Sequence, residues 1–449
     1  MPICDYCGKT TMVAFKCKYC GGTFCEEHKL PENHGCLKVE VEKEIGLVQQ
    51  EKPKLQVKGP LQEELHRVNQ MEKEFETYLN DLLKNRLEET IKFGKEFSPI
   101  NLAVYFVKNF GKILFFDPLL TLTQQYGLAD VEIVNEAGSP ARIRTGFNLA
   151  LFGDPGTGKT FAAYDFICGS ETVPAHGLPG RNRFCGGMTP ARFIQIGKAY
   201  EGKKFIFIIT EFKDWFKYQG MVEPLKVAME HKELGKETVR EVIEPYRFTS
   251  FFSVNYNATI KSGSEYKVSM KDPNFNAIED RMLCRLHVLT KERYEALAEA
   301  QMKVWRGEVK YEPAQKIRDH LTLVYAIETQ HPNIKDMFKP KPIMLTNRAL
   351  DMLKAARRTI LEHIGYRDTL GFSPRLESRT LQLASALSLV NYFRYEDKDV
   401  IPVDEHALRL AIRFYVEEVS IRSKESFDPA HILFDLGIYL ADEDLISKT

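Results

Sequence analysis

Potential metal ligands crowd the first 36 residues of this 449-residue chain. Six of its nine cysteines fall there together with two histidines, in the pairs C-x2-C, C-x2-C, C-x2-H and H-x-C. Zinc binds four thiolate or imidazole ligands tetrahedrally, and side chains at such short spacing can converge on one ion. The pattern therefore predicts two closed, structural Zn²⁺ sites made by Cys4, Cys7, Cys17, Cys20, Cys25, His28, His34 and Cys36.

A disulfide framework is the alternative use of so many cysteines. Disulfides suit exported chains, whereas this N-terminus lacks the apolar core of a signal peptide and places histidines at ligand spacing. We therefore favour zinc and expect a cytoplasmic location. The other three cysteines, Cys168, Cys185 and Cys284, have no motif spacing, and we expect them to be buried apolar side chains.

A second motif, G-x4-G-K-T, lies between an apolar run at 148–152 and a helix-like segment at 161–167. In this context of strand, loop and helix, glycines let backbone N–H groups wrap phosphates, and the helix N-terminus adds its positive end. Lys159 would reach the outer phosphates, and Thr160 would hold Mg²⁺. The motif predicts a nucleotide site formed by Gly153, Asp154, Pro155, Gly156, Thr157, Gly158, Lys159 and Thr160.

A nucleotide hydrolase also needs an acid at the end of a second strand. The apolar run at 205–209 suits a buried parallel strand and ends in Thr210 and Glu211. Glu211 falls where the attacking water would be activated, and the alternative is a surface acid at a strand end. Thr210 stands where a metal-binding Asp is expected. Either the magnesium is held by Thr160, phosphate oxygens and waters, or turnover is slow, or Asp214 compensates.

The cysteine and histidine spacing over residues 4–36 resembles the AN1-type zinc finger. The cross-braced arrangement of that family implies two ligand sets, the first being Cys4, Cys7, Cys25 and His28 and the second Cys17, Cys20, His34 and Cys36. Proteins with this finger mostly use it for protein contacts. The resemblance therefore implies a protein partner, with nucleic-acid contact as the alternative.

From the phosphate loop onward, residues 145–425 resemble the AAA+ superfamily and, within it, the minichromosome maintenance (MCM) helicases. The resemblance rests on residues 153–157, on 225–230, which are similar to the helix after the acidic strand, and on 231–246, where MCM proteins place a pore-lining hairpin. It implies ATP as the nucleotide and an α/β fold, a P-loop NTPase core with a parallel sheet and a C-terminal all-α lid.

The same resemblance assigns roles to polar side chains beyond the loop. Asn255 would sense the γ-phosphate, with Asn257 as the nearby alternative. Arg281 would be an arginine finger that reaches the nucleotide of the next subunit, with Arg285 as the alternative. Arg379 would be the second sensor arginine. The resemblance thus implies catalysis by Lys159, Glu211, Asn255, Arg281 and Arg379.

The elements that must position these residues follow from apolar spacing and length. At roughly 150 residues per domain, the chain suits about three domains. Apolar residues at three- and four-residue steps over 61–93 predict one long amphipathic helix, which packs on the chain or forms a coiled coil with a neighbouring subunit. The predicted order is a zinc finger at 1–38, a linker at 39–60, a helical region at 61–110, an AAA+ α/β core at 111–290 and an all-helical lid at 291–449.

Charge and hydropathy exclude two classes of protein. Equal counts of 62 basic and 62 acidic residues exclude a polybasic nucleic-acid binder. No stretch approaches the roughly 18 apolar residues of a membrane span. Any DNA contact must therefore lie in local elements such as residues 177–204 and the 231–246 hairpin. The first of these overlaps the glycine- and proline-rich segment 170–197, for which an ordinary surface loop is the alternative. The basic residues that suggest phosphate contact in or beside this segment are Arg181, Arg183, Arg192 and Lys198.

The resulting hypothesis is an ATP-hydrolysing motor that forms a homo-oligomeric ring, a hexamer, and acts on DNA in an MCM-like way. Its cofactors would be Mg²⁺ and two Zn²⁺, and the zinc finger would recruit a protein partner. Two alternatives stay open. A protein remodeller or chaperone would suit the neutral charge and the zinc finger, and an ATP-gated scaffold with weak hydrolysis would suit Thr210.

Overall fold

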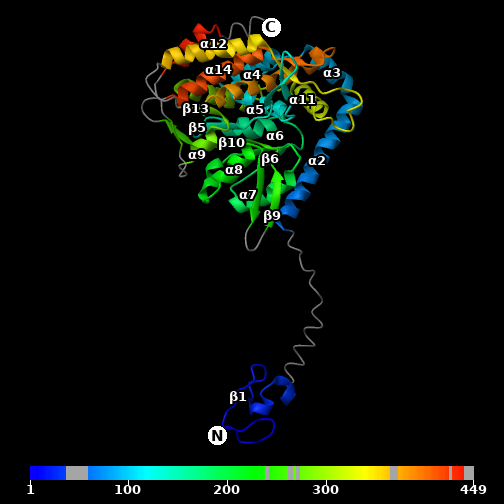
Figure 1. Cartoon of the computed structure of the whole chain (residues 1–449), viewed down its shortest axis with the longest axis vertical. Helices are drawn as coiled ribbons and strands as arrows, with labels where there is room; N and C mark the ends of the chain where they lie inside the picture. Colours follow the sequence, from blue (N-terminus) through cyan, green and yellow to red (C-terminus); the bar gives the residue numbers. More distant parts are fainter. Residues whose placement is uncertain are drawn as a thin grey trace. The chain divides into compact units, whose positions relative to one another are not determined.

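The computed structural model describes residues 1–36, 59–237, 242–260, 266–268, 274–364, 373–423 and 427–438. The chain divides into two compact units, Met1–Gly59 and Pro60–Thr449, which we call the finger unit and the α/β unit (Figure 1). None of the helices in these described ranges combines the length and apolarity that crossing a membrane requires.

The finger unit contains very little regular structure. Strand β1 (Phe15–Lys16) pairs antiparallel with β2 (Thr23–Phe24), and two 3₁₀ helices follow, η1 (Glu26–His28) and η2 (Pro31–His34). The cluster of buried apolar residues in this unit consists of Phe24 and three cysteines. So small a core cannot offset the conformational entropy lost on folding, so the unit must be held together by bound metal.

The α/β unit is built on a five-stranded sheet whose neighbouring strands all run parallel. In chain order the strands are β5 (Leu149–Gly153), β6 (Asn182–Phe184), β7 (Ile206–Ile209), β10 (Phe251–Tyr256) and β13 (Leu283–His287). In space the order is β13-β5-β10-β7-β6. Because the strands are parallel, their carboxyl ends meet at one edge, and β10 brings its end between those of β5 and β7.

Helices cover both faces of this sheet. Alternate residues of one strand enter different cores: Leu149 and Leu151 belong to the larger cluster, and Ala150 and Phe152 to the smaller one. Figure 1 shows α5 (Phe116–Gly127) and α6 (Phe166–Cys168) on one side and α8 (Val222–Met229) on the other. The apolar runs predicted as buried parallel strands are thus buried on both sides.

The expected single helix over 61–93 is two helices. Helix α2 (Pro60–Asn85) ends and α3 (Leu87–Glu96) begins around Arg86, whose backbone is not helical (φ −136°, ψ 6°). The Arg86 guanidinium donates to the buried Asp319 carboxylate (Nε–Oδ2 2.8 Å), and this tertiary contact lies at the break. Helix α2 buries Phe75 and Leu79 against the rest of the unit, so it packs on its own chain.

The expectation that residues 291–449 are all helical is wrong in one respect. Strands β14 (Ile343–Leu345) and β15 (Ile401–Pro402) join β3 (Glu132–Asn135) and β4 (Pro140–Arg144) in a second sheet of order β15-β14-β3-β4. Strands of two and three residues are too short to show a period in the sequence. Pairing with β3 and β15, both far away in the chain, makes β14 a strand. The domain boundaries at residues 110 and 290 stay predictions.

The remaining elements complete the unit. The hairpin predicted at 231–246 is confirmed, because β8 (Glu233–Glu237) pairs antiparallel with β9 (Val242–Arg247), while residues 238–241 lie outside the described ranges. The other elements are α4 (Pro99–Leu114), the π-helical turn η3 (Phe161–Asp165), α7 (Pro190–Gly197), η4 (Lys198–Tyr200), η5 (Phe212–Lys217), β11 (Ala258–Ile260), β12 (Tyr266–Val268), α9 (Phe275–Glu279), α10 (Lys291–Trp305), α11 (Ala314–Glu328), α12 (Asn347–Ile364), α13 (Arg375–Ser388), η6 (Leu389–Tyr395), α14 (Glu405–Arg422) and α15 (Pro429–Asp435).

Candidate metal centres and nucleotide site

The finger unit gathers its eight cysteine and histidine ligands into two groups. Within each group every ligand atom lies within 4.8 Å of the others. The spacings include 4.0 Å between the Sγ atoms of Cys7 and Cys25 and 4.0 Å between those of Cys17 and Cys36, and tetrahedral zinc with Zn–S bonds of about 2.3 Å places two sulfurs about 3.8 Å apart. The predicted cross-braced sets are confirmed: Cys4, Cys7, Cys25 and His28 form one group, and Cys17, Cys20, His34 and Cys36 the other.

The two histidines present different ring nitrogens. His28 places Nδ1 3.2 Å from the Cys25 sulfur, whereas His34 places Nε2 3.7 Å from the Cys20 sulfur. The other nitrogen of His34, Nδ1, lies 2.8 Å from the carbonyl oxygen of His28. A donated hydrogen bond there leaves Nε2 unprotonated and oriented for metal, and it ties the second site to the first.

Backbone groups favour the thiolate form of two ligands. Burial acts to raise the pKa of the Cys4 thiol, but backbone N–H groups of Cys25, Cys7 and Tyr6 outweigh it and lower the pKa to about 6. The backbone N–H of Cys20 is the main cause that lowers the pKa of Cys17 to about 6. Thiolates bind zinc and thiols do not, so the donor set fits two structural zinc ions.

In the α/β unit, β5 leads directly into the glycine-rich loop of residues 153–160, the predicted phosphate loop. Gly153 has φ +131°, and a Cβ there would lie 2.0 Å from the carbonyl oxygen of His287 on the neighbouring strand. Gly156 and Gly158 also have positive φ, 76° and 88°. These conformations require glycine, so the spacing of the motif follows from the path of the loop.

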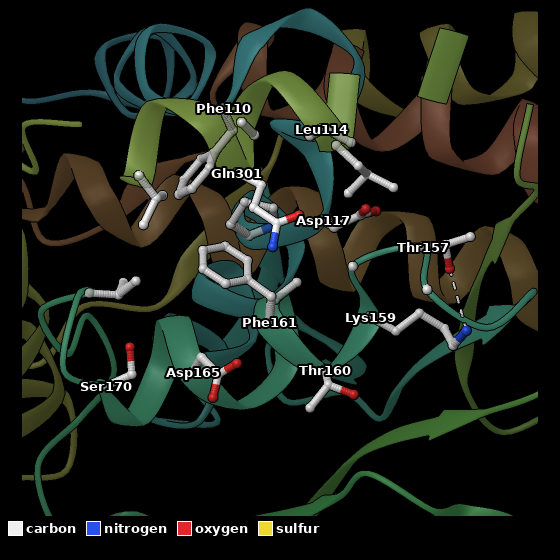
Figure 2. Close-up of a pocket in the computed structure, with 18 of the residues that line it drawn as sticks. Phe110, Leu114, Asp117, Thr157, Lys159, Thr160, Phe161, Asp165, Ser170 and Gln301 are labelled. Carbon is white, nitrogen blue, oxygen red and sulfur yellow. Dashed lines mark hydrogen bonds between the residues drawn. The ribbon is translucent and has the colours of Figure 1, made fainter. Parts of the chain in front are cut away.

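Lys159 is folded back onto the loop. Its exposed fraction is 8%, and its ammonium donates to the carbonyl oxygen of Gly153 (3.1 Å), to that of Asp154 and to the Thr157 hydroxyl (3.4 Å), the last contact being drawn in Figure 2. Burial lowers the pKa of Lys159. A partly desolvated cation whose partners are neutral oxygens is well placed to exchange them for an anion.

A cavity of about 850 Å³ opens beside the loop (Figure 2). Its polar end is lined by the loop, by Thr210 and Glu211 after β7, and by Asn255 and Asn257 at the end of β10. Its apolar end is lined by side chains from α4, η3, α10 and the segment after α10, including Phe110, Leu114, Phe161, Leu297, Trp305 and Tyr311. Polar strand ends and aromatic side chains lining one cavity suit a ligand with phosphates at one end and a flat ring at the other.

Asn255 is the most unusual polar residue of this cavity. Its exposed fraction is 2%, and neither its amide nitrogen nor its amide oxygen has a hydrogen-bond partner among the described residues. An unpaired buried amide costs about 1–3 kcal/mol. Such a cost is typical of a group that has its partner only when a ligand or water is bound.

The acids near the cavity differ from the expectation in one detail. Asp214, offered as compensation for Thr210, pairs with Lys217 (2.9 Å) and does not line the cavity. Asp165, which sequence reasoning missed, does line it, on the π-helical turn after the loop. Burial raises the pKa of Asp165. No sequence pattern distinguishes such a turn from an ordinary helix.

The structure does not bring the predicted arginines to the cavity of their own chain. Arg281 precedes β13, at the opposite edge of the sheet from the phosphate loop, and its Nε donates to Glu230 (2.8 Å). Arg379 has an exposed fraction of 6% and donates to the carbonyl oxygen of Met282 (2.6 Å). The role of Arg281 toward the nucleotide of the next subunit and the sensor role of Arg379 stay predictions. Arg285 contacts Asp117 and Glu417 of its own chain and does not fit an arginine finger.

The basic residues of the 170–197 region face acids of their own chain. Arg181 pairs with Glu72 (2.7 Å), and Arg183 with Glu64 (2.6 Å). The other two are also paired, Arg192 with Glu63 (3.5 Å) and Lys198 with Glu244 (3.4 Å). The expectation of a phosphate-contacting loop is wrong for Arg181 and Arg183, because helix α2 covers this edge of the sheet and its glutamates neutralise them. The segment is also no simple surface loop, since it supplies β6 and α7.

The three cysteines outside the finger unit carry no motif chemistry. Cys185 and Cys284 are each 1% exposed, as expected, and Cys168 is partly buried. Burial raises the pKa of Cys185 to about 12, so its thiol stays protonated at neutral pH.

Comparison with known proteins identifies one of the two units. A family model described as AN1-like zinc finger matches residues 4–40. No curated protein matches the chain. The matched residues include both ligand groups, so the N-terminal part of this sequence is an AN1-type zinc finger.

Proposed function

We propose that the α/β unit binds and hydrolyses ATP as an AAA+ ATPase. The observation that carries this proposal is the unpartnered amide of Asn255 in a cavity that also holds the phosphate loop and Glu211. Three strand ends of the sheet converge there, and the AAA+ resemblance assigns a nucleotide role to each. The aromatic end of the cavity offers room for a base.

Each residue has a distinct part in the proposed reaction. Loop N–H groups and Lys159 bind the phosphates, and Lys159 gives up its carbonyl partners for them. Glu211 orients the attacking water and accepts its proton, and Asn255 donates to the γ-phosphate or to that water. Mg²⁺, for which Thr160 is the loop ligand, would neutralise charge on the outer phosphate oxygens.

ATP hydrolysis by purified full-length protein tests the proposal. We expect turnover that falls at least 100-fold in Lys159→Ala and in Glu211→Gln, with Glu211→Gln retaining ATP binding. Lys354→Ala, an exposed lysine on α12, is the matched control and should keep wild-type turnover. Equal rates of phosphate release by wild type and Lys159→Ala would contradict the proposal.

We propose that the output is mechanical work by a ring of subunits on a polymer, with the zinc finger recruiting a protein partner. The MCM-like order of elements favours DNA, and its remaining local candidate is the β8–β9 hairpin. The pairing of Arg181 and Arg183 with α2 removes one supposed DNA contact and favours the alternative, a protein remodeller. Stimulation of turnover by DNA but not by unfolded protein would support the first, and the reverse would support the second.

A further inference from the structure

A buried ion network lies against the phosphate loop and is not used by the proposed reaction. Asp117 of α5 is its centre, with an exposed fraction of 3%. Its Oδ1 accepts from His287 Nε2 (2.9 Å) and Arg285 Nε (3.3 Å) of β13, and its Oδ2 accepts from Arg293 Nη2 (2.7 Å) of α10. Through Arg285 the network continues to Glu417 of α14.

The charges in this network are determined by their surroundings. Burial acts to raise the pKa of Asp117, but the neighbouring groups of His287, Arg285 and Arg293 outweigh it and hold the pKa far below its usual range. Burial lowers the pKa of His287 to about 4, so this imidazole is neutral at pH 7 and donates from Nε2. The pair of Asp117 and Arg293 is therefore a buried carboxylate and a buried guanidinium.

Arg293 connects Asp117 to the phosphate loop. Its Nη2 and Nε donate to the carbonyl oxygen of Thr157, at 2.8 and 3.3 Å. The C=O and N–H of one trans peptide point in opposite directions, so fixing the Thr157 carbonyl toward Arg293 turns the N–H of Gly158 away from it. Arg293 is itself fixed, because its backbone N–H donates to the Thr290 side chain that caps α10 (3.2 Å). Figure 2 shows Asp117 between Leu114 and Thr157, on the side of the cavity formed by the loop.

We propose that Asp117 and Arg293 are positioning residues that hold the phosphate loop in its nucleotide-binding conformation. The proposal rests on the function proposed above and adds a specific consequence. The Asp117–Arg293 pair orients the loop and not the attacking water. Loss of the pair therefore weakens nucleotide binding and leaves turnover of bound nucleotide nearly unchanged. The Asp117 carboxylate also joins α5, β13 and α10 to the loop, and Arg285 extends this connection to α14.

A purely structural role would look different. Breaking any buried ion pair destabilises a protein, because it leaves one charge without a partner. The pair of Arg183 and Glu64 provides a matched comparison, since the exposed fractions of its side chains are 11% and 1%, against 8% and 5% for Arg293 and Asp117. It lies under α2 and makes no contact with the loop.

The test measures binding of magnesium-ATPγS by calorimetry to full-length wild type, Arg293→Gln, Arg293→Lys and Arg183→Gln. We expect Arg293→Gln to raise Kd about tenfold, equivalent to about 1.4 kcal/mol, and kcat at saturating ATP to change less than about twofold. Arg293→Lys should lie between, because lysine keeps the charge but not the two-pronged donor. Arg183→Gln should lower the unfolding temperature and leave Kd unchanged.

The outcomes separate this proposal from the proposed function. If wild type does not bind the nucleotide, both are overturned. If wild type binds it and Arg293→Gln raises Kd no more than Arg183→Gln does, only the positioning role is overturned. Should Arg293→Gln fail to fold, Arg293→Lys and the nearly isosteric Asp117→Asn decide, and wild-type Kd in both would overturn the positioning role.

Discussion

The finger unit and the phosphate-loop cavity use their polar residues in opposite ways. In the finger, eight ligands within 33 consecutive residues replace a hydrophobic core, so the functional groups are also what holds the fold. In the α/β unit, two apolar clusters hold the fold, and the cavity carries a buried Lys159 and an unpaired Asn255 at a cost to stability. Loss of a ligand should unfold the first unit, whereas loss of a cavity residue should spare the second.

Zinc removal should have the largest effect. We expect two zinc ions per chain by metal analysis, and chelation should unfold the finger unit completely, since zinc binding to such modules contributes on the order of 10 kcal/mol to folding. The thermal transition of the α/β unit should not move. Cys20→Ser should lower the zinc content, while Cys168→Ser should retain two ions. A finger that stays protease-resistant without metal would contradict the comparison.

Asn255→Ala should lower turnover without lowering stability, the reverse of what loss of a zinc ligand does to the finger unit. We expect turnover to fall about 100-fold, as for loss of one transition-state donor, with no loss of stability to urea, because the substitution removes an amide that has no partner. Asn148→Ala is the matched control. Asn148 accepts from the backbone N–H of Phe252 (3.0 Å), so its loss should cost about 1–3 kcal/mol.

Thr210→Asp should have a smaller effect, in the favourable direction. Thr210 lines the cavity next to Glu211, and Asp214 is engaged with Lys217, so a carboxylate at 210 supplies a metal ligand that the cavity lacks at this position. We expect turnover to rise about tenfold, or about 1.4 kcal/mol of barrier. An unchanged rate would show that the remaining ligands hold the metal adequately, and Thr210→Asn serves as the uncharged control.

The smallest expected effect concerns pH. Burial raises the pKa of Glu328 to about 8 from an ordinary value near 4.5, so the folded α/β unit binds the proton more tightly than the unfolded chain. The contribution of Glu328 to stability is therefore present below about pH 4.5 and is lost as pH rises to 8. Glu328→Gln should stabilise the unit at pH 8, where the buried wild-type carboxyl is partly ionised, and should leave its stability unchanged at pH 4.

The finger unit should respond to pH in the opposite direction. Its ligands must be deprotonated to bind zinc, so acid should release the metal and unfold it. Two measurements over one acid titration check this contrast: the zinc content of wild type, and the difference in unfolding temperature between wild type and Glu328→Gln. We expect that difference to shrink as zinc is released, and a difference that stayed constant from pH 8 to pH 4 would contradict the role of Glu328.

Much of the candidate site could be predicted because its signals are local. Cysteine and histidine spacing predicted two zinc sites, and the AN1-type resemblance supplied the division of the eight ligands into two sets. The loop at 153–160 could also be predicted from the sequence, because positive φ at Gly156 and Gly158 demands glycine at those positions. Asn255 was found only through the order of elements that the resemblance supplied.

The rest depended on contacts between residues far apart in the chain. Arg293 and Asp117 are 176 residues apart, and nothing in the sequence distinguishes them from surface charges. Arg183 looked like a phosphate contact until α2 placed Glu64 against it, 119 residues away. The sequence by itself thus determined which residue types stand at fixed spacing, the zinc ligands of the finger unit and the glycine-rich loop for which we propose phosphate binding. Tertiary structure decided which charges are free to act, because burial and pairing are properties of neighbours in space.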